Sequence, residues 1–150
     1  MVAVSSRVPP PGWKTMVALM LFGAVAMIVY WGIWFFGDRS ILATQSTDAY
    51  SIFENAFPLA DAWLGATSLL ASIALIRQRP VGLLWTLLAA SAAIYLGCMD
   101  VLYNLENGVY RGGDAGAVAT EVAINVFSFG TGIYGIVFAW RGRAFLAQES

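Results

Sequence analysis

Four carboxylic acids lie within stretches of this chain that are otherwise apolar: Glu54, Asp61, Asp100 and Glu121. An ionisable side chain at membrane depth is costly to insert and by default indicates a functional site. Unequal burial lets one carboxyl keep its proton at neutral pH while a wetter neighbour stays ionised, which is the pairing that acid–base catalysis uses. The sequence therefore predicts catalytic carboxyls, with Asp61 as the deepest, protonated acid, Asp100 or Glu121 as the base or charge stabiliser, and Glu54 nearer the rim.

Amide and aromatic side chains accompany these acids. The amides recur at three- and four-residue steps from the acids, which places them on the same helical faces. The candidate ligand-binding residues are Asn104, Asn125, Tyr30, Trp34 and Tyr103. A structural role is the alternative, because asparagines also join membrane helices and aromatic residues also form belts at the membrane interface. We expect the acids and amides to converge on one polar cavity in the outer half of the protein.

The elements that must position these residues are membrane-spanning helices. Hydrophobic residues make up 59% of the chain and charged residues only 11%, and the mean hydropathy is +0.72. A hydrocarbon core about 30 Å thick needs roughly 20 apolar helical residues for each crossing. Such stretches are predicted at 15–36, 49–76, 81–103 and 116–140. The predicted fold class is an all-α integral membrane protein, a bundle of four transmembrane helices that forms one domain over residues 1–150.

Basic residues predict the orientation of this bundle, because lysine and arginine favour the cytoplasmic ends of membrane spans. One side of the predicted spans carries Arg7, Lys14, Arg77, Arg79, Arg141 and Arg143, whereas the other carries Arg39 and Arg111. Both termini are therefore expected in the cytoplasm, with the protein in a bacterial inner (plasma) membrane. Asp114 is expected to cap the last helix.

Small residues continue the same helical faces toward the cytoplasm. They include Gly65, Gly97, Gly132 and Gly135. Because small residues let membrane helices approach closely, we expect these glycines at tight helix contacts. The bundle should then be closed at its cytoplasmic end and open at its outer end.

The composition argues against several kinds of site. The chain has no histidine and one cysteine, so haem iron and most zinc ions lack their usual ligand. The thiol of Cys98 cannot close a disulfide within the chain. The net charge is −1, and no basic tract suits a nucleic acid. We expect no metal, no cofactor and no nucleic-acid partner.

Three kinds of function suit these residues. The first is a membrane-embedded acid–base enzyme that isomerises, cyclises or opens an epoxide of a lipophilic small molecule resembling a terpenoid, sterol or polyketide. The second is a proton-coupled transporter or binding protein for lipophilic cations, which would need a homodimer. The third is a non-catalytic accessory membrane subunit. The enzyme is the leading expectation, with the lipophilic molecule and membrane lipid as its partners.

Overall fold

The computed structural model describes residues 9–43, 45, 47–112 and 115–144, and every regular element within them is a helix. The elements are α1 (Trp13–Phe36), η1 (Arg39–Ile41), α2 (Asp48–Glu54), α3 (Pro58–Ile76), α4 (Val81–Glu106), α5 (Val109–Gly112) and α6 (Ala115–Arg141). With α2 and α3 counted as one span, four spans are long and apolar enough to cross a membrane. The predicted all-helical, four-span fold is confirmed. The expected cap at Asp114 and the basic anchor at Arg7 lie outside the described residues.

The second predicted span is interrupted, which the sequence analysis did not expect. Thr47 begins α2 by accepting a hydrogen bond from the backbone N–H of Tyr50 at 3.2 Å. The helix stops at Glu54, and α3 starts at Pro58, its first residue. Proline has no N–H to donate to the preceding turn, so it is tolerated at a helix start but not in a helix interior. The prediction of one continuous helix over 49–76 is therefore wrong at 55–57.

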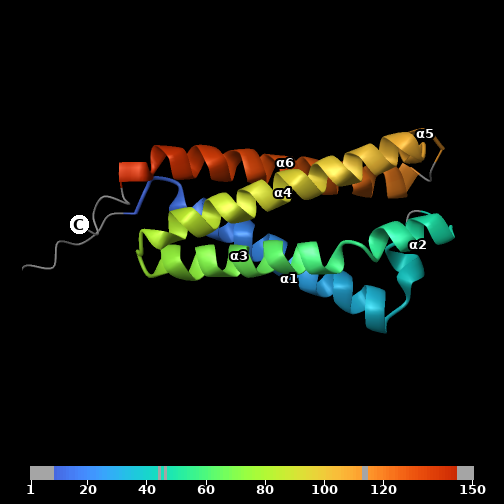
Figure 1. The fold of residues 1–150 in the computed structure, drawn as a ribbon, viewed down its shortest axis with the longest axis horizontal. Helices are drawn as coiled ribbons and strands as arrows, with labels where there is room; N and C mark the ends of the chain where they lie inside the picture. The colour runs from blue at the N-terminus through green and yellow to red at the C-terminus, as the bar shows by residue number, and fades with distance from the viewer. Residues whose placement is uncertain (1–8, 44, 46, 113–114, 145–150) are drawn as a thin grey trace, which may run out of the picture.

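The long helices lie side by side along the longest dimension of the molecule (Figure 1). Each of α1, α3, α4 and α6 packs against the next in the chain, and α1 also touches α6. The start of α1 is tied to α6, because the Tyr134 hydroxyl donates to the backbone oxygen of Gly12 at 3.4 Å. The beginning and end of the described chain therefore lie at one end of the bundle, with the turn between α3 and α4. Short elements η1, α2 and α5 lie at the other end (Figure 1).

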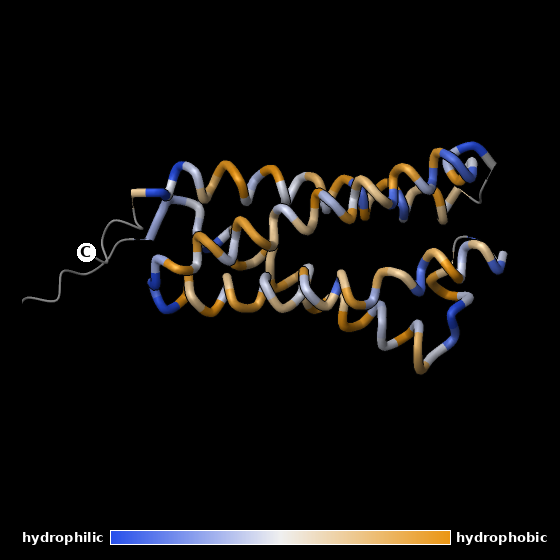
Figure 2. Tube along the Cα trace, in the orientation of Figure 1, coloured by the Kyte–Doolittle hydropathy of each residue, from blue (hydrophilic) through white to orange (hydrophobic). Residues whose placement is uncertain are grey.

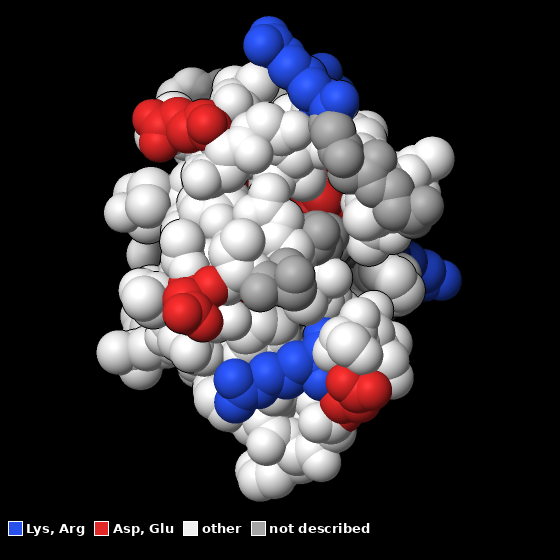
Figure 3. Space-filling model, turned by 90° about the vertical axis from the view of Figure 1, so that its right-hand side faces the viewer, with Lys and Arg blue, Asp and Glu red and all other residues white. Residues whose placement is uncertain are grey.

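Hydropathy follows this division, with hydrophilic residues gathered at the two ends and apolar residues along the helices between them (Figure 2). At the end that carries η1, α2 and α5, acidic and basic side chains are spread over the face (Figure 3). Near η1, hydrogen bonds from the Ser40 side chain and from the Ser40 backbone N–H, the latter at 2.9 Å, lower the pKa of the Asp38 carboxyl. Composition and length together make this chain an integral membrane protein.

Glycine contacts close the bundle between α4 and α6. A Cβ atom on Gly132 would stand 2.5 Å from Cγ1 of Ile94 and 3.0 Å from the backbone oxygen of Ala90. Gly135 and Gly97 also face atoms of the opposite helix closely. The expectation of tight contact is confirmed for these three glycines. It is wrong for Gly65, because no atom lies within 4 Å of the position that its Cβ would take.

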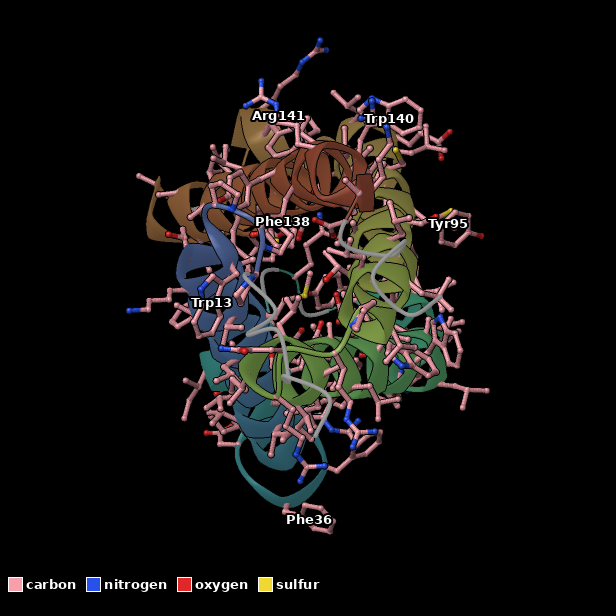
Figure 4. The ribbon with its side chains drawn as sticks, turned by 90° about the vertical axis from the view of Figure 1, so that its left-hand side faces the viewer. Trp13, Phe36, Tyr95, Phe138, Trp140 and Arg141 are labelled. Carbon is pink, nitrogen blue, oxygen red and sulfur yellow. The ribbon has the colours of Figure 1, made fainter. Side chains whose placement is uncertain are left out.

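Aromatic side chains on the outside of the bundle face the surroundings. Tyr95 and Trp140 project away from the helices, whereas Phe138 lies among them (Figure 4). Tyr95 is 64% exposed and Trp140 is 67% exposed. The Arg143 guanidinium lies 4.7 Å from the centre of the Trp140 ring, as a cation–π pair at a membrane interface would.

Candidate functional site

The acids and amides of α4 and α6 form a buried hydrogen-bond network with one tyrosine from α5. We call Asp100, Asn104, Tyr110, Glu121 and Asn125 the α4–α6 network. Asn125 Nδ2 donates to Asp100 Oδ2 at 2.8 Å and to the Tyr110 hydroxyl at 3.1 Å. Asn104 Nδ2 donates to Glu121 Oε2 at 3.1 Å, and it lies 3.3 Å from both Asp100 Oδ2 and the Tyr110 hydroxyl. The network joins three helices through side chains alone.

Helical spacing explains how this network assembles. Asp100 and Asn104 stand four residues apart on α4, and Glu121 and Asn125 stand four residues apart on α6, so each pair shares a face. Asn125 Nδ2 also reaches back to the backbone oxygen of Glu121 at 2.9 Å. Sequence reasoning missed Tyr110, which comes from a helix of four residues. The sequence signal for the short helix that carries Tyr110 was the turn residue Gly108 just before it. The backbone φ of Gly108 is +67°, a conformation that favours glycine.

The α4–α6 network is almost closed to its surroundings. Asn104 is 1% exposed, and Glu121 and Asn125 are each 6% exposed. The hydrogen bonds that the acids accept include those from the neutral amides of Asn104 and Asn125. Among the buried side-chain atoms of the described residues, Asn125 Oδ1 has no hydrogen-bond partner.

The acids on the other side of the bundle are held by aromatic donors. The Tyr30 hydroxyl donates to Glu54 Oε2 at 2.8 Å, and Tyr50 also hydrogen-bonds this carboxyl. Trp31 Nε1 donates to Asp61 Oδ2 at 2.9 Å. Sequence reasoning placed Tyr30 at the site but named neither Trp31 nor Tyr50 as a site residue. Their signal was weak, because aromatic residues at helix ends usually serve as membrane anchors.

Two of the candidate ligand-binding residues pack against other side chains. Trp34 is 1% exposed, and its Nε1 donates to Asn55 Oδ1 at 3.0 Å. The Arg39 guanidinium lies 5.4 Å from the centre of the Trp34 ring. Tyr103 stacks on Phe53 with ring centres 3.8 Å apart. These contacts hold the break between α2 and α3 against α1 and α4, a structural role that the sequence left as the alternative.

A groove of about 490 Å³ runs between α1 and α3. Its walls are almost wholly apolar, and they include Met27, Trp31 and Phe35 from α1 and Asp61, Gly65 and Ala66 from α3. The vacancy beside Gly65 is part of this space. Asp61 is the predicted acid that lines the groove, while Asp100 and Glu121 belong to the α4–α6 network. The acids and amides expected at one site thus have different hydrogen-bond partners, and their catalytic and ligand-binding roles stay predictions.

The described residues contain no group of three or more histidine, cysteine, aspartate or glutamate side chains arranged to hold a metal ion. The two sites therefore offer hydrogen bonding, negative charge and an apolar groove.

One known protein is similar to this chain over most of the chain's length. No protein-family model matches the chain, and no solved structure matches it significantly. The chain is 30% identical over 142 residues to NrfE of Escherichia coli K12, described as a probable cytochrome c-type biogenesis protein. The match covers 89% of this chain but 22% of NrfE. The chain thus spans about a fifth of the length of this relative.

This similarity corrects the function expected from the acids. The relative is described by its part in cytochrome c biogenesis, not as an isomerase, cyclase, epoxide hydrolase or transporter. The expectation of an acid–base enzyme for terpenoid-, sterol- or polyketide-like molecules is therefore wrong. The error arose because membrane-depth carboxyls indicate a site without specifying its chemistry. Here they are engaged by neutral donors within the fold.

Proposed function

We propose that this chain is a haem-handling membrane component of c-type cytochrome biogenesis. The observation that carries this proposal is the similarity to NrfE over most of the chain. Since the chain matches only part of that relative, the activity of the whole relative is not transferred with it. We assign to this chain the binding and positioning of haem as a cargo.

The chain's own residues limit how haem could be held. A c-type haem is attached through a C-x-x-C-H motif, whereas this chain has one cysteine and no histidine. It is therefore not itself a c-type cytochrome of that kind. Histidine, the commonest haem ligand, would have to come from elsewhere. The Met27 thioether is the iron ligand that the α1–α3 groove could supply.

The groove between α1 and α3 suits the apolar body of a porphyrin. The faces of Trp31 and Phe35 offer aromatic surface, and the vacancy beside Gly65 leaves room next to them. Binding through apolar contact and stacking releases a ligand more readily than binding through a strong iron ligand does. Such binding suits transfer of haem rather than permanent retention.

The location of the protein is part of this proposal. Lys14, Arg77, Arg79 and Arg141 lie near the end of the bundle where the described chain begins and ends. The bias of basic residues toward the cytoplasm supports a cytoplasmic location for that end, with the protein in a bacterial plasma membrane. Asp61 and Trp31 then mark the part of the groove nearer the outer face.

Titration with haemin tests the groove. The purified protein in detergent should bind haemin with quenching of tryptophan fluorescence. Gly65→Leu should weaken this binding about tenfold or more, because the new side chain fills the vacancy, and tenfold corresponds to about 1.4 kcal/mol. The matched control is Gly32→Leu on α1, which also has no atom within 4 Å of its Cβ position and is absent from the groove lining. Equal haemin affinity in the two variants would contradict the assignment of the groove.

Deletion in the source organism tests the function itself. Loss of the chain should lower the amount of membrane protein that carries covalently bound haem, as read from haem-stained gels. Complementation with the Gly32→Leu variant should restore the stain, and complementation with Gly65→Leu should not. Unchanged haem staining after deletion would overturn the proposed function.

A further inference from the structure

An arginine follows one end of the α1–α3 groove. The groove runs from Ala24 and Leu69 to Phe35 and Pro58. Phe35 and Pro58 lie at the end of α1 and the start of α3, so they mark the end of the groove nearer to η1. The chain passes from α1 into η1, which carries Arg39 and lies at the end of the bundle away from the termini (Figure 1). Arg39 thus comes four residues after the last groove residue of α1.

Two contacts with Trp34 hold the Arg39 side chain in place. Arg39 Nε donates to the backbone oxygen of Trp34 at 2.9 Å, and the guanidinium lies 5.4 Å from the centre of the Trp34 ring. The centres of the Trp34 and Trp31 rings are 6.2 Å apart, and Trp31 lines the groove. The positive charge of Arg39 is therefore separated from the groove wall by one aromatic ring.

The Arg39 guanidinium keeps donors for a further partner. Its Nε bonds to Trp34, whereas the N–H groups at the tip of an arginine side chain are additional donors. The neighbouring acid, Asp38, accepts its hydrogen bond from the backbone N–H of Ser40. Arg39 is exposed, so its tip is accessible to a ligand. Arginine suits carboxylates in particular, because its parallel N–H groups match the oxygens of a carboxylate.

We propose that Arg39 binds the propionate groups of haem and thereby sets the direction in which haem lies in the groove, an inference that rests on the proposed function. Haem carries both propionates on one edge of its macrocycle, and the opposite edge is apolar. The apolar edge enters the groove beside Trp31 and Gly65. The propionate edge stays at the end near η1, where hydrophilic residues gather (Figure 2). Asp61 in the same groove offers a propionate no attraction, whereas Arg39 does.

The experiment compares haemin with haemin dimethyl ester, which keeps the macrocycle and the iron but carries neutral esters in place of the propionates. Both are titrated into the purified full chain in detergent, with tryptophan fluorescence as the readout. Arg39→Gln should weaken haemin binding about fivefold, the upper range for a partly exposed ion pair. The same variant should bind the ester as tightly as the wild type does. The matched control is Arg111→Gln, an exposed arginine on α5, which should leave the affinity for both porphyrins unchanged.

Each other outcome overturns the inference in a recognisable way. If Arg39→Gln bound both porphyrins as the wild type does, the propionates would not lie at Arg39, while the groove would still bind haem as proposed. Equal loss of haemin and ester binding would give Arg39 a structural role only. Equal weakening of haemin binding by Arg111→Gln would indicate a general effect of charge. A wild type that bound neither porphyrin would overturn the inference and the assignment of the groove to haem together.

Discussion

The contact between α4 and α6 and the contact between α1 and α3 use the same kinds of residue with opposite results. At the contact between α4 and α6, Gly132 lies against Ile94. The carboxyls of Glu121 and Asp100 accept hydrogen bonds there from the amides of Asn104 and Asn125. At the second, Gly65 faces open space and Asp61 lines a groove. A glycine in a membrane helix can therefore lie at a tight helix contact or beside an open space, and the size of the side chains on the facing helix decides which. Between α4 and α6, the Ile94 side chain fills the space beside Gly132. Between α1 and α3, no side chain fills the space beside Gly65 and Ala66, which line the groove.

The largest expected effect comes from filling the closed contact. Gly132→Leu places new atoms against Ile94 and the backbone of Ala90, and overpacking of this kind costs about 3 kcal/mol. Gly65→Leu should change the free energy of unfolding by less than about 1 kcal/mol, because its space is open. Thermal unfolding of both variants in detergent measures the difference. Equal destabilisation would remove the distinction between the two contacts.

A smaller effect is expected from removing the donors to the acids. Asn104→Leu leaves the buried Glu121 carboxyl without its amide donor, at a cost of about 2 kcal/mol. Trp31→Phe removes the donor to Asp61 but keeps an aromatic ring. Because Asp61 lines the groove and is less buried than Glu121, the loss should be about 1 kcal/mol or less. Chemical unfolding of the two variants compares these losses, and a greater loss for Trp31→Phe would reverse the contrast.

The smallest effect concerns the charge in the groove. Asp61→Asn keeps an acceptor for Trp31 and should leave thermal stability almost unchanged. Because haem propionates are anionic and an ionised Asp61 would repel them, this change should increase haemin affinity by about threefold at a pH at which Asp61 is ionised. Glu106→Gln, an exposed change at the end of α4, should leave haemin affinity unchanged. Weaker haemin binding by Asp61→Asn would show that the carboxyl assists the ligand instead.

The sequence was sufficient for the spans and for much of the α4–α6 network. The lengths of the apolar stretches predicted the four membrane crossings. The spacing of four residues predicted that Asp100 shares a helical face with Asn104, and Glu121 with Asn125. The break before Pro58 could have been predicted from the proline itself, but the sequence analysis predicted one continuous span over 49–76. Helical periodicity could not place Tyr50 and Tyr110, because α2 and α5 have only 7 and 4 residues.

The function was beyond reach of the residues alone. Carboxyls and amides at membrane depth are equally suited to proton transfer, ion binding and helix association. Which of these a chain performs depends on the groups that surround each side chain, as the different hydrogen-bond partners of Asp61 and Glu121 show. Similarity to a protein of described function was needed to choose among them.

The two walls of the groove differ in length, which links it to the thickness of the bilayer. The 24 residues of α1 extend about 36 Å as a helix, whereas the 19 residues of α3 extend about 28 Å. A hydrocarbon core of about 30 Å matches α3 but is shorter than α1, and a long span adapts by tilting. A thicker bilayer should bring α1 upright and a thinner one should lean it further. Lipid composition would then set the angle between the two walls, and with it the width of the groove.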